Sequence, residues 1–143
     1  MIVRLIDDIK DTDREVFAEN GNWVSRRILL QKDGMGFSFH ETIIFANTET
    51  MIWYKNHLEA VFCVEGEGEI ESLEDERVYQ IRPGTMYALN NNDRHLLRAH
   101  SMDMRLVCVF NPALTGEEVH GQDGSYPAPE EMEQGCSTVE EKY

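Results

Sequence analysis

The sequence predicts an all-β fold, either a small antiparallel barrel or a double-sheet sandwich, on three observations. Apolar and polar side chains alternate at period two through segments rich in β-branched and aromatic residues, as half-buried strands require. Turn signals such as DGMG, EGEG, RPG and NNND separate these segments. No long helical periodicity interrupts them. Many short strands at regular spacing are typical of a barrel or a sandwich.

The chain opens with a short helical segment, and a hairpin follows. The first 20 residues mix a short apolar start with many charges, which predicts one or two helical turns. Residues 23–31 and 36–47 come next, and because DGMG joins them we expect an antiparallel hairpin. Further strands are expected at 50–54, 59–64, 68–73, 77–81, 85–89, 95–99 and 104–110.

The C-terminal end differs from the rest in composition. Beyond Pro112 the apolar pattern fades, and from about Ser125 the chain is acidic and poor in large apolar residues. Such a segment has too little apolar surface to order on its own. We therefore expect a single domain over residues 1–124 and a flexible acidic tail over 125–143.

Charge and cysteine content narrow the functional classes. The chain has 13 Lys plus Arg against 27 Asp plus Glu, and this formal net charge of −14 repels nucleic acid and anionic membranes. Cys63, Cys108 and Cys136 form no C-x-x-C pair, so neither a disulfide framework nor a zinc knuckle is indicated. No apolar leader or membrane-spanning run is visible. We expect a cytoplasmic protein that binds a small molecule but neither nucleic acid nor membrane.

One carboxylate stands out within an apolar strand. In the segment EAVFCV the period-two rule places Glu59 on the same face as Val61 and Cys63. Charges are rarely buried without a partner, so Glu59 either lies at a solvated edge or belongs to a site. Gly66 follows it seven residues later, after which the chain turns.

A second element, GTMYALNNNDRH, runs from Gly84 to His95. Together with Glu59 and Gly66 it resembles the two cupin motifs, in which a Glu with a Gly seven residues later is paired with G-x5-P-x-G-x2-H. Asn residues stand here where the second motif has its Pro and its second Gly. The resemblance implies a cupin-type double-stranded β-helix, a jelly-roll barrel, with a short N-terminal helical segment. It also places Glu59 and His95 at metal-ligand positions.

The first motif departs from the usual cupin pattern. Cupins commonly carry H-x-H a few residues before the Glu, but residues 52–55 contain no histidine. His57 falls outside that spacing, and we expect it, like His100, at the surface. Tyr87, in the strand before His95, is the expected substitute ligand. One nitrogen and two oxygen ligands suit Fe(II), although other divalent metals of similar hardness fit the same set.

Longer phrases resemble one family within the cupins. The segments MGFSFHETIIFANTET, IWYKNHLEAVFCVEGEGEIE, RPGTMYALNNNDRHLLRA and LVCVFNPALTGEEVHGQDGSYP are similar to ectoine synthase, and the resemblance extends to about Pro127. It implies a cytoplasmic, dimeric, iron-dependent lyase of the osmotic stress response. Such an enzyme closes N-γ-acetyl-L-2,4-diaminobutyrate to the compatible solute ectoine with loss of water. Metal ligands would be Glu59, Tyr87 and His95, and the substrate site would comprise Trp23, Arg27, His40, Thr42, Tyr54, Leu89, Phe110, Glu118 and His120.

The implied reaction needs a base, an acid and an anchor. A base must take a proton from the α-ammonium group, and His120 and Glu118 are candidates, with Tyr54 a weaker one. Arg27 is suited to bind the substrate carboxylate through two hydrogen bonds, which fixes the amine for attack. His40 stands where relatives commonly carry a side-chain amide, so its role stays open.

Two other interpretations remain beside this one. The same barrel and metal serve cupin enzymes of other reaction types, such as oxygenases and isomerases. A cupin can also bind a small ligand without catalysis. Oxygen uptake would favour the first, and ligand binding without turnover would favour the second.

Overall fold

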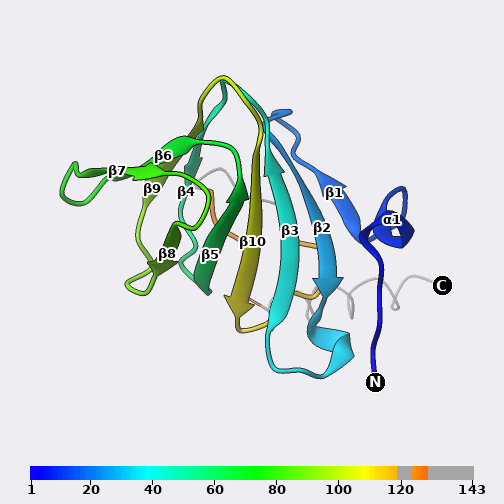
Figure 1. Ribbon diagram of the computed structural model, residues 1–143. Coiled ribbons are helices and arrows are strands. Elements are labelled where there is room, and N and C mark those ends of the chain that lie inside the picture. The colour runs from blue at the N-terminus through cyan, green and yellow to red at the C-terminus, as the bar shows by residue number, and fades with distance from the viewer. Residues whose placement is uncertain (119–123, 129–143) are drawn as a thin grey trace.

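The protein forms two antiparallel β-sheets that face each other, as the computed structural model shows (Figure 1). The structure describes residues 1–118 and 124–128. The six-stranded sheet has the order β1-β2-β3-β10-β5-β8, and the four-stranded sheet has the order β4-β9-β6-β7. The elements are α1 (Ile6–Ile9), β1 (Glu15–Phe17), β2 (Trp23–Leu29), the 3₁₀ turn Gln31–Asp33, β3 (Ser38–Ile44), β4 (Glu49–Ile52), β5 (Leu58–Glu65), β6 (Gly68–Ser72), β7 (Val78–Ile81), β8 (Met86–Leu89), β9 (His95–Ala99) and β10 (Met104–Asn111).

The strands predicted from the sequence are confirmed. Each expected segment overlaps one strand, with ends that differ by a few residues, and β2 pairs with β3 as the predicted antiparallel hairpin. The short helical segment is confirmed as α1, which has four residues. The three-residue strand β1 was not predicted, and it joins the large sheet by pairing with β2.

Side-chain alternation explains why these sheets close around a core. Along β5 the residues Glu59, Val61 and Cys63 are buried, whereas Ala60 and Phe62 between them are exposed. The central strand β10 repeats this alternation on its inner face. The sheets therefore bury one face each against the other and leave the outer face to solvent.

The backbone conformation explains which residue types stand at two positions of the motifs. Gly66 has a φ of 85°, and a Cβ there would collide with the carbonyl oxygen of Asp103, so a side chain cannot be accommodated. Asn92, which replaces the second glycine of the later motif, has a φ of 51°. Asn tolerates this left-handed conformation better than other residues with side chains. The chain therefore keeps the turn that the motif requires.

The core includes a residue beyond the expected domain boundary at 124. Tyr126 is 3% exposed and belongs to the central hydrophobic cluster. Most of the expected tail, residues 129–143, lies outside the described residues.

Cys63 and Cys108 are buried and carry free thiols. Within residues 1–118 and 124–128 no helix has the length and apolar character needed to span a membrane.

Candidate active site

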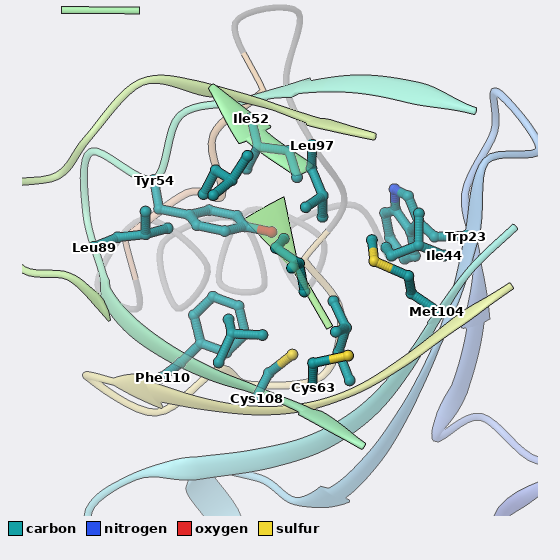
Figure 2. Packing of buried hydrophobic residues seen from close by; sticks show 14 of the residues in the cluster. Trp23, Ile44, Ile52, Tyr54, Cys63, Leu89, Leu97, Met104, Cys108 and Phe110 are labelled. Carbon is teal, nitrogen blue, oxygen red and sulfur yellow. The ribbon is translucent and has the colours of Figure 1, made fainter. Parts of the chain in front are cut away.

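A cavity lies inside the barrel, and both sheets contribute to its walls. Figure 2 shows Phe110 and Cys108 pointing inward from one side, opposite Tyr54 and Leu97. The Tyr54 hydroxyl points toward the centre (Figure 2). The cavity is lined by Trp23, Ser25, His40, Thr42, Ile44, Ile52, Tyr54, Glu59, Tyr87, Leu97, Leu106, Cys108, Phe110 and Tyr126.

Strand register brings two of the expected metal ligands together. In the β5–β8 pair Val61 lies opposite Tyr87, so Glu59, two residues before Val61, is a diagonal neighbour of Tyr87 on the inner face. His95 comes from β9 in the other sheet, and its ring centroid lies 6.4 Å from that of Tyr87. His95 lines a second cavity that Tyr87 also borders. Tyr87 therefore borders both cavities, with Glu59 in the wall of the first and His95 in the wall of the second.

The hydrogen bonds of His95 leave one nitrogen available. Its Nδ1 lies 2.9 Å from the carbonyl oxygen of Asp93, which fixes the proton on Nδ1 because a carbonyl only accepts. The opposite nitrogen, Nε2, is buried and has no hydrogen-bond partner among the residues that the structure describes. A neutral imidazole with one nitrogen oriented by a carbonyl and the other bare is the usual state of a metal ligand.

The carboxyl group of Glu59 is also buried, and its negative charge is not balanced by a nearby positive one among the described residues. Burial raises its pKa to about 8, although a hydrogen bond from the Cys108 thiol opposes the shift. Within residues 1–118 and 124–128 no ion pair to this carboxylate is found, and a divalent metal would supply the missing positive charge. The site therefore fits a metal held by Glu59, Tyr87 and His95. In the described part of the chain no three His, Cys, Asp or Glu side chains lie close enough together to hold a metal ion. The set Glu59, Tyr87 and His95 has only two such residues, and its third member is a tyrosine.

Arg27 is the largest fully buried side chain of the described residues. Its Nη1 and Nη2 donate to the carbonyl oxygens of Gly116 at 2.6 Å and Glu118 at 3.0 Å, and its Nε has no hydrogen-bond partner in the described part of the chain. Among residues 1–118 and 124–128 its side-chain partners are these two carbonyl oxygens, and no carboxylate is one of them. Its positive charge acts on His40 and Tyr126, both of which line the cavity. A buried guanidinium without an anionic partner favours an anion in the cavity beside it.

Glu118 is also buried, but its carboxylate is occupied. One oxygen accepts hydrogen bonds from the Thr115 amide at 2.6 Å and hydroxyl at 2.8 Å, and the other accepts from the Gly116 amide at 2.9 Å. These bonds hold the turn whose carbonyls receive Arg27. Glu118 therefore supports Arg27 and does not line the cavity.

His40 faces the cavity as a neutral imidazole. Burial, together with the charge of Arg27, lowers its pKa well below the usual value. Its Nδ1 lies 3.2 Å from the Ser25 hydroxyl, and its Nε2 is buried with no hydrogen-bond partner within residues 1–118 and 124–128. Depending on the tautomer, Nε2 either donates to a ligand or accepts from it. His40 is thus equipped to contact a polar group in the cavity.

The structure brings most of the expected site residues together. Trp23, Thr42, Tyr54 and Phe110 line the main cavity with His40, and Leu89 lines the adjoining one. Arg27 and Glu118 lie behind the wall, and His120 falls outside the described residues. The expectation that His100 is exposed is confirmed.

Three residues near the cavity were missed or misplaced. The expectation that His57 lies at the surface is wrong, because it is 1% exposed and its Nδ1 lies 3.0 Å from the Pro112 carbonyl oxygen. Ser25 and Tyr126 line the cavity and were not predicted. The only signal for Ser25 was its place on the inward face with Trp23.

The two facing antiparallel sheets define the fold of the protein, which is that of the cupins. A cupin domain of an XRE family transcriptional regulator from Enterobacter cloacae superposes with a TM-score of 0.54 at 14% identity, covering 63% of this chain and 96% of that one. This likeness concerns the fold alone.

Closer similarity identifies the family. A sequence model of ectoine synthase matches residues 1–130. The L-ectoine synthase of Desulfatibacillum aliphaticivorans is 62% identical over 127 residues, which are 89% of this chain and 97% of that one. The crystal structure of ectoine synthase from P. lautus superposes with a TM-score of 0.79 at 57% identity, covering 87% of each chain. The chain belongs to the ectoine synthase family, and it is an enzyme of the hydro-lyase type.

Proposed function

We propose that this enzyme closes N-γ-acetyl-L-2,4-diaminobutyrate to ectoine, with Fe(II) held by Glu59, Tyr87 and His95. Ectoine is a compatible solute, so the reaction serves the osmotic stress response. The observation that carries the proposal is the unpartnered Nε2 of His95, buried where Glu59 and Tyr87 also converge. Two oxygens and one nitrogen suit Fe(II), and other positions stay open for a ligand. When bound, the metal acts as a Lewis acid that draws electron density from the substrate carbonyl.

The anchor for the substrate is the buried positive charge of Arg27. The substrate carries one carboxylate, and the partners of the Arg27 guanidinium among the described residues are backbone carbonyls rather than carboxylates. Their attraction in a site shielded from water holds the α-amine within reach of the acetamide carbon. Trp23 and Phe110, which are 6% and 2% exposed, exclude water around the closing ring.

Proton transfer is the second task of the chain's residues. The α-ammonium group must lose a proton before it attacks. The oxygens of Glu118 already accept hydrogen bonds from Thr115 and Gly116, so of the two predicted bases His120 is the one that we propose to accept the proton. Burial raises the pKa of Tyr54 well above its usual value, so its hydroxyl keeps its proton at neutral pH. Tyr54 is therefore better suited to donate a proton to the departing oxygen than to act as a base.

The reaction is tested by anaerobic turnover. Metal-stripped enzyme that has been reloaded with Fe(II) is expected to convert N-γ-acetyl-L-2,4-diaminobutyrate to ectoine without O₂, because ring closure and loss of water involve no change in oxidation state. Chromatography coupled to mass spectrometry measures the product. An enzyme that consumes O₂ belongs to another reaction type, and one that binds ectoine without forming it is a binding protein.

We propose further that the enzyme is a cytoplasmic homodimer. One edge of the six-stranded sheet is β8, which among the described strands pairs with β5 and no other, and exposed apolar side chains lie on these two strands. Phe62 on β5 and Met86 on β8 lie opposite each other and are 47% and 60% exposed. An apolar sheet edge of this kind is usually covered, and a second copy of the chain is the simplest cover.

The substitution Phe62→Glu is expected to convert the dimer to a monomer, because it places a charge in the centre of this apolar surface. Sedimentation velocity measures the change. Met102→Glu is the matched control, because Met102 is also exposed, at 67%, but lies in the turn between β9 and β10. If the Phe62→Glu variant still sediments as a dimer, the interface lies on another surface.

A further inference from the structure

Ser25 and His40 form a buried polar pair in the wall of the main cavity, and no step of the proposed reaction uses Ser25. Ser25 lies on β2 opposite Thr42 of β3, and His40 is two residues before Thr42. His40 is therefore a diagonal neighbour of Ser25 on the inner face of the sheet. The Ser25 hydroxyl and Nδ1 of His40 lie 3.2 Å apart, so the two side chains share a hydrogen bond.

The direction of this hydrogen bond decides which nitrogen of His40 carries the proton. Burial lowers the pKa of His40 well below its usual value, so the imidazole is neutral and only one nitrogen is protonated. If Nδ1 donated to the serine, the serine hydrogen would have no acceptor among residues 1–118 and 124–128, and the bare Nε2 would also lack a partner. If the serine donates to Nδ1, the Nε2–H group is the one that is left unpaired. Because each unpaired polar group in a buried site is costly, the second arrangement is favoured.

The Nε2–H group is then a hydrogen-bond donor that the described residues leave unsatisfied. The two ring nitrogens point in different directions, so the contact of Nδ1 with Ser25 turns Nε2 away from the serine. The His40 ring lies 5.1 Å from the ring of Phe110, and both residues line the main cavity. A buried donor in a cavity wall favours a ligand that places an acceptor beside it.

Arg27 determines which kind of acceptor suits this donor. It lies directly opposite His40 in the β2–β3 pair, and its positive charge acts on the His40 ring. A negatively charged oxygen gains more from such a charge than a neutral one does. His40 lines the cavity, whereas Arg27 lies behind the wall. The pair therefore suits a carboxylate, which His40 contacts from the cavity and Arg27 attracts from behind.

We propose that Ser25 is a positioning residue that holds His40 as the tautomer protonated on Nε2, and that this N–H group donates to the carboxylate of the substrate. The identity of the acceptor rests on the proposed function, whereas the tautomer does not. A side-chain amide always carries hydrogens on its nitrogen, but an imidazole offers a donor at Nε2 only when the proton is there. A histidine at position 40 therefore needs a neighbour such as Ser25, and an asparagine would not.

The tautomer is measured by ¹⁵N nuclear magnetic resonance on the full chain, labelled at histidine and loaded with diamagnetic Zn(II). Protonated and bare imidazole nitrogens differ widely in chemical shift, and the His40 signals are those absent from His40→Asn. We expect a protonated Nε2 and a bare Nδ1 in the unmodified enzyme. In Ser25→Ala both shifts should move toward those of a mixture of tautomers. A protonated Nδ1 in the unmodified enzyme, or unchanged shifts in Ser25→Ala, overturns the inference.

The acceptor is tested by kinetics. The substrate keeps its carboxylate throughout the reaction, so a hydrogen bond to it contributes equally before and during ring closure. Ser25→Ala is therefore expected to raise KM about 5-fold and to change kcat less than about twofold. Ser25→Thr keeps the hydroxyl and should restore KM. Ser101→Ala, at an exposed residue in the turn between β9 and β10, is the control and should leave both constants unchanged.

Two comparisons separate this role from mere packing. For N-acetyl-1,3-diaminopropane, which lacks the carboxylate, Ser25→Ala should change KM less than about twofold. In the His40→Asn background it should also change KM less than about twofold for the natural substrate, because an amide has no tautomer to fix. An equal rise in KM for both substrates, or with either residue at position 40, overturns the inference.

Failure of the proposed function is a separate result. If the unmodified enzyme forms no ectoine, the assignment of the carboxylate as acceptor falls with the proposed function. The resonance measurement needs no turnover, so it decides the role of Ser25 in either case. The spectrum of the unmodified enzyme still decides the tautomer if Ser25→Ala does not fold, and Ser25→Thr then carries the kinetic comparison, in which a KM raised as for a lost donor contradicts the role of the hydroxyl.

Discussion

Replacement of His95 by alanine is expected to abolish Fe(II) binding and to lower the rate of ectoine formation by about 1000-fold or more. Lewis-acid activation of a carbonyl contributes several kcal/mol, and each factor of ten in rate corresponds to about 1.4 kcal/mol. His95 is the single predicted nitrogen ligand, and its bare Nε2 is already buried and oriented by the Asp93 carbonyl. Metal content per chain, measured after dialysis, reports binding independently of activity.

The matched control is His100→Ala, because the His100 side chain is 46% exposed and does not line the main cavity. It should retain both metal and activity. Glu59→Gln gives a further comparison, since it keeps the shape of the side chain but removes the negative charge that a divalent metal needs. Full metal content in His95→Ala and Glu59→Gln would mean that the metal binds elsewhere, even if activity were lost.

Most of the fold could be predicted because an antiparallel sheet with one face in solvent leaves its period in the sequence. Along β5 the alternation of Glu59, Val61 and Cys63 with exposed neighbours follows directly from the period-two rule. The strand β1 could not be found in this way. It has three residues, and its place depends on ion pairs such as that of Glu15 with Arg26, which no local pattern reveals.

The site residues on strands could be predicted for the same reason, whereas those outside strands could not. The neighbours Arg26 and Arg27 look alike in the sequence, but alternation sends Arg26 outward to Glu41 and Arg27 inward to a fully buried position behind the cavity wall. Tyr126 and His57 have no such period around them. Their burial follows from contacts between segments about 70 residues apart, so only the folded chain shows it.

Replacement of Arg27 by methionine is expected to reduce kcat/KM for N-γ-acetyl-L-2,4-diaminobutyrate by about 100-fold or more. Removal of one member of a buried charge pair typically costs about 2–5 kcal/mol, which corresponds to roughly 30-fold to 4000-fold. The loss has two sources that must be separated. Arg27 is proposed to bind the substrate carboxylate, but it also donates to the carbonyls of Gly116 and Glu118 and so orders their turn.

A substrate analogue without the carboxylate separates the two sources. N-acetyl-1,3-diaminopropane can close the same six-membered amidine ring but offers Arg27 no anion. If Arg27 acts through the carboxylate, Arg27→Met should lower kcat/KM for the natural substrate and leave that for the analogue nearly unchanged. If Arg27 acts through the turn, Arg27→Met should lower kcat/KM equally for both substrates, and the role of Arg27 in substrate binding would be refuted. Arg27→Lys should fall between the wild type and Arg27→Met, because an ammonium keeps the charge but cannot reach two carbonyls and a carboxylate together.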